Sequence, residues 1–354
     1  MVERFLKQTK FTSVEDYNKN LEFIIPENFN FAYDVMDAWA EEKPDGLALL
    51  WTNDQGEEIR ATFAQLKEQS DQAASYLQTL GIGKNDPVML ILKRRYEWWV
   101  IMLALCKIGA IVIPATHMLT KKDIVYRNTR ASVKAIICVD DDYVMSQVEA
   151  AMPESPTAKT YIYVSEKTDN VRSLDECTKE RKDEIVLDEC TKVRKDEIVL
   201  DECTKVRKDN SSSRPWHDWQ SEWQKAPKFV RPAFVNTNDD TMLMYFTSGT
   251  SGEPKMVAHD YLYAMGHLTT GVFWHNLHEG SLHLTVADTG WGKAVWGKFY
   301  GQWFAGATVF VFDHEKFNAD TLLRQIEKYR VTSFCAPPTI YRFMIREDLS
   351  KYDL

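Results

Sequence analysis

The sequence predicts an α/β fold in which most strands are parallel. From about residue 30 onwards, apolar runs of strand length alternate with longer stretches in which apolar residues recur at helical spacing. The 354 residues are 44% hydrophobic and 27% charged, which is close to the average for soluble globular proteins. Single cores stop growing at roughly 250–300 residues, so we expect two subdomains.

The amino-terminal half is typical of repeated βαβ units. A capping box at Thr62–Gln65 predicts the start of a helix, and Gly81 predicts its end. Beyond it, the pattern predicts strands over 87–92, 110–114 and 135–139 and helices over 98–108 and 120–128. Because Trp98–Ile108 is apolar on all sides, we expect this helix to pack between layers.

The carboxyl-terminal half repeats the alternation. The pattern predicts strands over 242–246, 282–287, 308–312 and 331–335, and helices over 258–275, 293–304, 319–329 and from 339 onwards. Ligands in open α/β sheets bind beyond the carboxyl ends of the strands. Three loops follow such strands, at Thr247–Lys255, Asp288–Trp291 and Ala336–Tyr341. We therefore expect them to lie on one rim and to border a cleft.

The loop after the strand over 242–246 has the composition of a phosphate-binding site. Its glycines allow the backbone to approach an anion closely, its hydroxyls add donors, and its lysine adds a positive charge. The glycines are three apart and proline precedes the lysine, so the loop is not a Walker sequence. The alternative is a surface turn rich in serine and glycine. We predict that phosphate is bound by Thr247, Ser248, Gly249, Thr250, Ser251, Gly252 and Lys255.

The segment Tyr245–Lys255, YFTSGTSGEPK, resembles the phosphate-loop signature of the acyl-adenylate-forming (AMP-binding) superfamily. Four further segments are similar to short- and medium-chain acyl-CoA synthetases of the acetyl-CoA synthetase type: YEWW at 96–99, IPAT at 113–116, ADTGW at 287–291 and APPTIYR at 336–342. The resemblance covers nearly the whole chain except about 169–213. It implies the large amino-terminal domain of that fold, with stacked, mainly parallel sheets flanked by helices.

The resemblance implies an ATP-dependent, AMP-forming acid–CoA ligase of fatty acid metabolism. Such an enzyme activates a short- or medium-chain carboxylate as acyl-AMP and transfers the acyl group to CoA. Its co-substrates are ATP with Mg²⁺, and CoA. The alternatives are an amino-acid-activating adenylation domain and a non-catalytic binding or interaction protein that retains half of the site. Adenylation domains use a pocket aspartate for the substrate amine, whereas Trp291 stands in the corresponding segment here.

The acyl pocket implied by the resemblance has two parts, Thr289, Gly290 and Trp291 in one segment and Ala336 and Pro337 in the other. Trp291 would form an aromatic wall that limits the length of the acyl tail, and the alternative is an ordinary core aromatic. Small residues such as Ala336 and Pro337 also serve plain turn geometry after a strand.

Charged residues stand near both predicted sites. Asp288 would repel a carboxylate substrate, so we expect it to orient the backbone or its neighbours instead. Arg94 and Arg95 follow a strand and are candidates for CoA phosphates, although a solvated rim is the favoured interpretation.

Similar enzymes carry further segments that would fall beyond Leu354, among them an adenine-binding stretch, a glutamate that binds Mg²⁺ and a carboxyl-terminal lid domain with the catalytic lysine. We therefore expect an amino-terminal fragment, with no catalytic residue and no metal ligand of its own, that does not turn over alone. We expect a first subdomain over 1–230, with a poorly ordered repeat insertion over 169–213, and a second over 231–354.

Charge and hydropathy argue against two classes of protein. The net charge is −9 and no long basic stripe occurs, which argues against a nucleic-acid binder. The longest apolar run, Trp98–Cys106, is far shorter than the roughly 20 residues of a membrane span. The start lacks the apolar core of a signal peptide, so we predict a cytoplasmic protein.

Three cysteines in apolar surroundings, Cys106, Cys138 and Cys335, are predicted to be buried free thiols. No oligomeric state is predicted.

Overall fold

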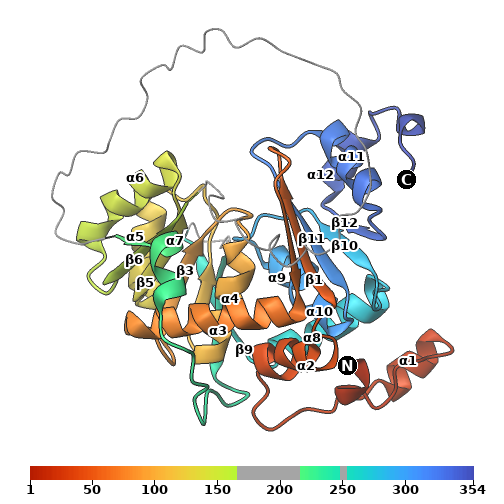
Figure 1. The fold of residues 1–354 in the computed structure, drawn as a ribbon, viewed down its shortest axis with the longest axis horizontal. Coiled ribbons are helices and arrows are strands. Elements are labelled where there is room, and N and C mark those ends of the chain that lie inside the picture. Colours follow the sequence, from red (N-terminus) through yellow and green to blue (C-terminus); the bar gives the residue numbers. More distant parts are fainter. Residues whose placement is uncertain (166–215, 248–252) are drawn as a thin grey trace, which may run out of the picture. The chain divides into compact units, whose positions relative to one another are not determined.

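Two β-sheets organise the protein in the computed structural model (Figure 1). The structure describes residues 1–165, 216–247 and 253–354. The insertion predicted over 169–213 lies outside the described residues. Among the described strands, eight pairings are parallel and two are antiparallel. The predicted α/β class with mainly parallel strands is therefore confirmed.

The larger sheet has seven strands in the order β7-β6-β5-β3-β4-β8-β9. Their bounds are β3 (Pro87–Ile91), β4 (Ile111–Pro114), β5 (Ala135–Val139), β6 (Thr160–Val164), β7 (His217–Asp218), β8 (Thr241–Thr247) and β9 (Lys255–Asp260). The central strands β4 and β5 are buried along their whole length, as continuous runs of Val and Ile in a parallel sheet require. Antiparallel β9 forms one edge.

The smaller sheet has five strands in the order β12-β10-β11-β1-β2. Their bounds are β1 (Leu47–Asn53), β2 (Glu58–Thr62), β10 (Leu282–Thr285), β11 (Thr308–Asp313) and β12 (Ser333–Cys335). Early strand β1 pairs in parallel with late strand β11, with Leu49 opposite Val309. Each sheet thus combines strands from both sides of residue 230, and the predicted boundary there does not separate the two sheets.

Helices connect the strands. They are α1 (Val14–Asn20), α2 (Ala38–Glu42), α3 (Phe63–Thr79), α4 (Glu97–Ile108), α5 (Lys121–Ala131), α6 (Asp142–Ala151), α7 (Trp219–Glu222), α8 (Tyr263–Thr269), α9 (Gly292–Lys298), α10 (Tyr300–Phe304), α11 (Ala319–Tyr329) and α12 (Pro338–Met344). The predicted capping box of α3 is present, because the Gln65 amide N–H donates to Thr62 Oγ1 at 3.2 Å and the Thr62 N–H donates to Gln65 Oε1 at 2.9 Å. Gly81, with φ of 76°, follows this helix as predicted.

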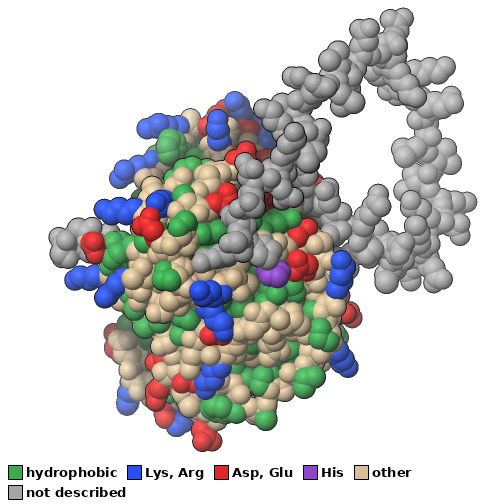
Figure 2. Space-filling model, turned by 90° about the vertical axis from the view of Figure 1, so that its left-hand side faces the viewer, with side chains coloured by type: hydrophobic (Ala, Val, Ile, Leu, Met, Phe, Trp, Pro, Cys, Tyr) green, Lys and Arg blue, Asp and Glu red, His purple; other side chains and the backbone are tan. Residues whose placement is uncertain are grey.

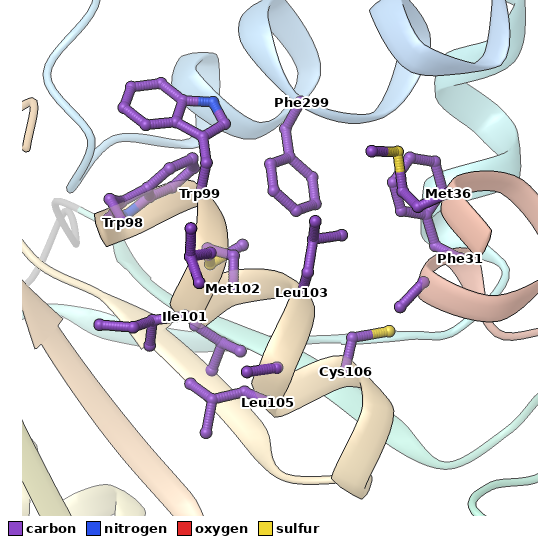
Figure 3. Packing of buried hydrophobic residues seen from close by; sticks show 14 of the residues in the cluster. Phe31, Met36, Trp98, Trp99, Ile101, Met102, Leu103, Leu105, Cys106 and Phe299 are labelled. Atoms are coloured by element: carbon purple, nitrogen blue, oxygen red, sulfur yellow. The ribbon is translucent and has the colours of Figure 1, made fainter. Parts of the chain in front are cut away.

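Helix α4 forms the centre of the largest hydrophobic core, as its apolar sequence predicts. Every residue from Trp98 to Ile108 is buried. Figure 3 shows Phe299 above the helix and Phe31 beside it, and the Trp98 and Phe299 ring centroids are 5.6 Å apart. Each large apolar side chain buried in this way contributes roughly 1.5–3 kcal/mol relative to exposure. The segments around α4 are therefore held firmly.

Two predicted helices differ from the structure. The prediction over 258–275 is wrong at its start, because residues up to Asp260 belong to β9, which pairs with β8. Helix α8 begins only at Tyr263. The predicted helix over 293–304 is interrupted at Phe299, whose φ and ψ are −145° and −77°. There the Phe299 N–H donates to Gln302 Oε1 at 2.9 Å, so a side chain starts a second helix, α10.

The charge distribution on the surface and the burial of the cysteines can be compared with the sequence-based predictions. On the face that Figure 2 shows, basic side chains are interspersed with acidic and hydrophobic ones. In the described part of the chain, no helix combines the length and apolar character that a membrane crossing requires. The described cysteines, Cys106, Cys138 and Cys335, are free thiols in buried positions, as predicted.

Candidate functional site

The loop that follows β10 connects the two sheets. Thr289 is buried, and its Oγ1 donates a hydrogen bond to the backbone oxygen of Lys93, directly after β3. Gly290 lies against the backbone of Ala115 and Thr116, directly after β4. A Cβ at Gly290 would overlap those backbone atoms, so only glycine fits there. Two of the predicted pocket residues therefore hold the sheets together at their carboxyl ends.

Asp288 orients its neighbours, as expected from its charge. Its Oδ1 accepts from the Gly290 N–H at 2.8 Å, and its Oδ2 lies 3.2 Å from His117 Nδ1. Burial raises the pKa of Asp288, but the hydrogen bonds from His117 and Gly290 outweigh it and leave the pKa below the usual value. The carboxylate is therefore ionised and already engaged.

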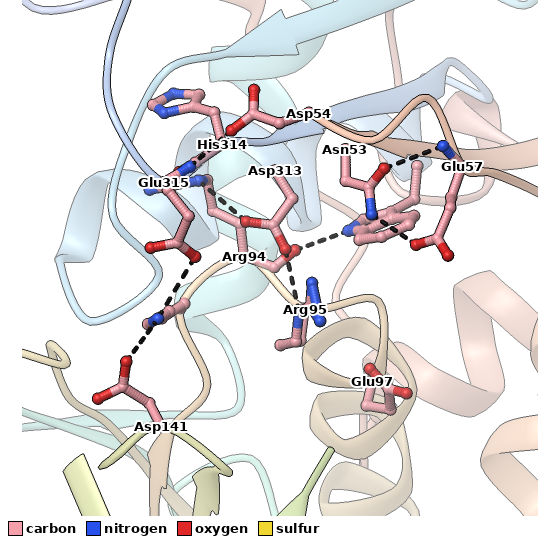
Figure 4. Close-up of polar contacts among 12 residues, drawn as sticks. Asn53, Asp54, Glu57, Arg94, Arg95, Glu97, Asp141, Asp313, His314 and Glu315 are labelled. Carbon is pink, nitrogen blue, oxygen red and sulfur yellow. Dashed lines mark hydrogen bonds and ion pairs between the residues drawn. The ribbon is translucent and has the colours of Figure 1, made fainter. Parts of the chain in front are cut away.

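A charged cluster lies where β3 and β11 end (Figure 4). Asp313 accepts a hydrogen bond from Arg95 Nε at 3.1 Å and lies 3.6 Å from Arg94 Nε. The Arg94 guanidinium also donates to the backbone oxygen of His314. The interpretation of both arginines as a solvated rim is therefore wrong, because their side chains are largely buried and bound to Asp313.

A cavity of about 220 Å³ lies at the carboxyl edge of the five-stranded sheet. Of the predicted acyl-pocket residues, Trp291 and Pro337 line it, whereas Thr289, Gly290 and Ala336 do not. Trp291 is 60% exposed, so it is not a core aromatic. The lining consists of Arg94, Leu284, Thr285, Val286, Ala287, Asp288, Trp291, Lys293, Lys298, Val311, Phe312, His314, Leu322, Pro337 and Ile340.

Lys298, at the end of α9, is a cavity residue that the sequence analysis does not predict. It is buried, its Nζ donates to the Ala287 oxygen at 2.7 Å, and it lies 5.6 Å from the centroid of the Trp99 ring. Burial, together with the nearby Arg94, lowers its pKa to about 7. The signal in the sequence is a lysine set among aromatics, as in VWGKFYGQWF, which is unusual for a surface lysine.

The described ends of the predicted phosphate loop are Thr247 and Lys255, which face each other across the β8–β9 pair. Lys255 is exposed, and Thr247 Oγ1 donates to its backbone oxygen at 3.5 Å. The Tyr126 hydroxyl donates to the Pro254 oxygen at 2.8 Å and so fixes the start of β9. Neither end lines the cavity. The other predicted phosphate ligands, Ser248, Gly249, Thr250, Ser251 and Gly252, lie outside the described residues.

The three loops expected on one rim belong to two sheets. The loop over 247–255 follows a strand of the seven-stranded sheet, whereas those after β10 and β12 belong to the five-stranded sheet. Of the described residues in these loops, those that border the cavity belong to the last two. A larger cavity, of about 660 Å³, is lined by residues of the amino-terminal region and by Lys228, Phe229 and Arg231, and includes none of the predicted site residues that the structure describes. Within residues 1–165, 216–247 and 253–354, no group of three or more His, Cys, Asp or Glu side chains could hold a metal ion.

Comparison with protein families gives a match over residues 36–354 to the family described as AMP-binding enzyme. Acyl-coenzyme A synthetase ACSM4, mitochondrial, of Homo sapiens is 31% identical over 338 residues, which are 93% of this chain and 50% of that protein. Acyl-coenzyme A synthetase ACSM3, mitochondrial, of Pongo abelii is 31% identical over 97% of this chain and 52% of that protein. The chain thus spans about half the length of the curated relatives it matches.

Solved structures share the fold. The crystal structure of the anthranilate CoA ligase AuaEII in complex with anthranoyl-AMP matches with a TM-score of 0.72 at 18% identity, over 93% of this chain and 54% of that one. The Brucella canis acyl-CoA synthetase matches with a TM-score of 0.68 at 19% identity, over 90% and 49%. The predicted arrangement of mainly parallel sheets flanked by helices is confirmed by these matches.

Proposed function

We propose, from the premise that this chain belongs to the AMP-binding enzyme family, that it forms the acid-binding and phosphate-binding part of an ATP-dependent acid–CoA ligase. The main observation behind this proposal is the cavity that Trp291 and Pro337 line. Similarity to acyl-CoA synthetases over 93% of the chain supports the interpretation of this cavity as the acyl site. Relatives with this similarity are named acyl-coenzyme A synthetases.

The chemistry has two steps. A carboxylate oxygen attacks the α-phosphorus of ATP, the bond from that phosphorus to the bridging oxygen breaks, and pyrophosphate leaves with the electron pair. The CoA sulfur, having lost its proton, then attacks the acyl carbonyl and expels AMP. Mg²⁺ enters with the phosphates of ATP as part of that substrate. The role of this chain is to align the carboxylate with the phosphates and to neutralise charge.

Two described features support these roles. Lys255 places an exposed positive charge at the end of the predicted phosphate loop, where a nucleotide's phosphates could reach it. The cavity of about 220 Å³ is mainly apolar and is larger than the roughly 150 Å³ that holds benzene. Its size suits a short- or medium-chain or small aromatic acid. The wall at Trp291 would contact the acyl tail.

An amino-acid-activating domain is less well supported. It would need an acidic side chain free to receive the substrate amine, but Asp288, the acidic residue lining the cavity, is engaged by His117 and by the Gly290 N–H. The cytoplasmic location stays a prediction.

The test combines product analysis with direct binding. The protein is incubated with ATP, Mg²⁺, CoA and a panel of acids, and acyl-CoA and AMP are sought by mass spectrometry. Calorimetry in parallel measures ATP binding to the wild type, to Lys255→Ala and to Lys159→Ala, which changes an exposed lysine outside the site. We expect Lys255→Ala to weaken ATP binding about tenfold and Lys159→Ala to leave it unchanged. Absence of both ATP binding and thioester would refute the proposal.

A further inference from the structure

Among the described residues, two lysines, Lys107 and Lys298, are exposed by 1% or less, and they differ in what they contact. Lys107 is 0% exposed, and its Nζ lies 2.9 Å from Asp37 Oδ1 and 2.5 Å from Asp71 Oδ1. Lys298 is 1% exposed, and the one hydrogen-bond acceptor that the described residues offer it is the Ala287 oxygen. An ammonium group has three donors, and buried charges are normally paired. Lys298 therefore retains unused capacity for an anion.

The carboxylates nearest to Lys298 are already engaged. Asp288 and Asp313 both act on the Lys298 charge, but neither forms an ion pair with it in the described part of the chain. Asp288 is held by His117, and Asp313 by Arg94 and Arg95. Lys298 therefore lies near two carboxylates and the Arg94 guanidinium, and its described hydrogen bond goes to the Ala287 carbonyl rather than to a carboxylate.

The cavity beside Lys298 contains another polar group with unused capacity. His314 Nδ1 is buried and has no hydrogen-bond partner among the described residues, and its side chain lines the same cavity, as does that of Arg94, which is paired with Asp313. Buried polar atoms without partners are rare in native proteins and ask for a ligand. The lining side chains carry three cationic groups, on Arg94, Lys293 and Lys298, against one carboxylate. This excess of positive charge in the lining favours the binding of an anion.

The remaining lining is apolar and includes Leu284, Val311, Phe312 and Ile340. An anion that also has a hydrocarbon part fits both kinds of surface, and a free inorganic ion would fit only one. Burial holds the pKa of Lys298 near 7, so the approach of a carboxylate would return the amine to its charged form.

We propose that Lys298 binds a carboxylate group of the acid that occupies this cavity. The inference rests on the proposed function, because it takes the cavity as the acyl site. The carboxylate is either the one that reacts with ATP or a second one at the far end of a dicarboxylic acid. Both have the same chemistry toward the lysine.

The experiment measures binding by calorimetry with three probes of equal length, hexanoate, adipate and hexanamide. The variant Lys298→Met removes the charge and keeps the length of the side chain. Lys293→Met is the matched control, because Lys293 lines the same cavity but is less buried than Lys298. Removal of an unpaired buried charge is not expected to unfold a protein, and thermal melts of both variants verify this.

We expect Lys298→Met to lose about tenfold or more in affinity for a carboxylate probe, with a smaller change in Lys293→Met and none for hexanamide. A loss for hexanoate and adipate alike assigns the lysine to the reacting carboxylate, and a loss for adipate alone assigns it to a second one. Equal affinities in wild type and Lys298→Met would overturn the role of Lys298 and leave the acyl site intact. No binding of any probe to the wild type would overturn both.

A second readout is the pH dependence of acid binding. The groups that face Lys298 are Arg94, Asp288, Asp313 and His314. Affinity for the bound acid should fall as the pH rises from 6 to 9 in the wild type, because the free amine loses its proton in that range. In Lys298→Met this fall should disappear, whereas a purely structural lysine would leave the pH profile unchanged.

Discussion

At the scale of single residues, pairing distinguishes the two buried lysines. Lys107 has two carboxylates and belongs to the stability of the fold, whereas Lys298 faces a cavity and has a single carbonyl. The sequence around Lys107, ALCKIG, and that around Lys298, VWGKFY, are similarly apolar. The difference arises from residues distant in sequence, Asp37 and Asp71, which no local pattern connects to Lys107.

Lys107→Met should destabilise the protein by about 3–5 kcal/mol, because it removes the described ion-pair partner of the largely buried Asp37 and one of the two partners of Asp71. Urea unfolding measures the change. The control is Lys67→Met, which removes a partly exposed partner of Asp71 at 2.8 Å and should cost less than about 1 kcal/mol. Equal losses of stability in the two variants would show that the burial of Lys107 does not add to the cost of removing its charge.

Trp291→Ala should weaken acid binding about fivefold while changing the free energy of unfolding by less than about 0.5 kcal/mol, because the indole is largely exposed but borders the cavity. Trp274→Ala, which removes an indole that is 65% exposed and outside the cavity lining, serves as the control. Calorimetry and urea unfolding give the two quantities. If both variants bind the acid equally well, Trp291 is not a wall of the acyl site.

At the scale of elements, the loop after β10 depends on one glycine. Gly290→Ala should destabilise the protein by about 2–3 kcal/mol, because a Cβ there collides with the backbone after β4, and backbone cannot rotate aside. Gly83→Ala is the control, since a Cβ at Gly83 meets open space. Thermal unfolding compares them. A Gly290→Ala variant as stable as Gly83→Ala would mean that the two loops separate easily.

Elements with capping signals could be predicted from the sequence, and others could not. Helices α3 and α5 begin at the predicted Thr62 and Thr120 because a cap is decided by residues three apart. Strand β1 was missed, because its apolar run LALLWTN shows no alternation and owes its place to β11. Likewise, Lys255–Asp260 forms a strand only because β8 lies beside it. Of the residues that line the cavity, Trp291 and Pro337 are also pocket residues that the resemblance implies, whereas no local sequence pattern shows the burial of Lys298.

At the scale of the whole molecule, burial keeps four histidines neutral. It lowers the pKa of His267, His275 and His314 to about 4 and that of His283 to about 3. In the unfolded chain these groups bind protons below about pH 6.5. Between about pH 6.5 and 4 the unfolded state therefore holds more protons, so these histidines lower the stability as the pH falls through that range.

His267→Gln should reduce this loss, because it removes one proton that the unfolded state gains. Between pH 7.5 and 5 the wild type should lose up to about 2 kcal/mol more than the variant. Urea unfolding at both pH values gives the loss of stability of each protein. Burial raises the pKa of Asp37, which has the opposite effect on stability, but this effect is the same in the wild type and the variant and cancels when they are compared. His278→Gln, at a position exposed to solvent, should keep the slope of the wild type. If the stability of His267→Gln depends on pH as that of the wild type does, burial does not lower the pKa of His267.

The parallel pairing of β1 with β11 also has a consequence for synthesis. Strand β1 ends at Asn53 and its partner residue in β11 is Asp313, so 260 residues must be added before the pair can form. At ribosomal rates of about 5–20 residues per second, this takes roughly 13 to 50 s. Throughout that interval the apolar side chains of the nascent β1 lack their final neighbour, and assembly of the five-stranded sheet is delayed until β11 has left the ribosome.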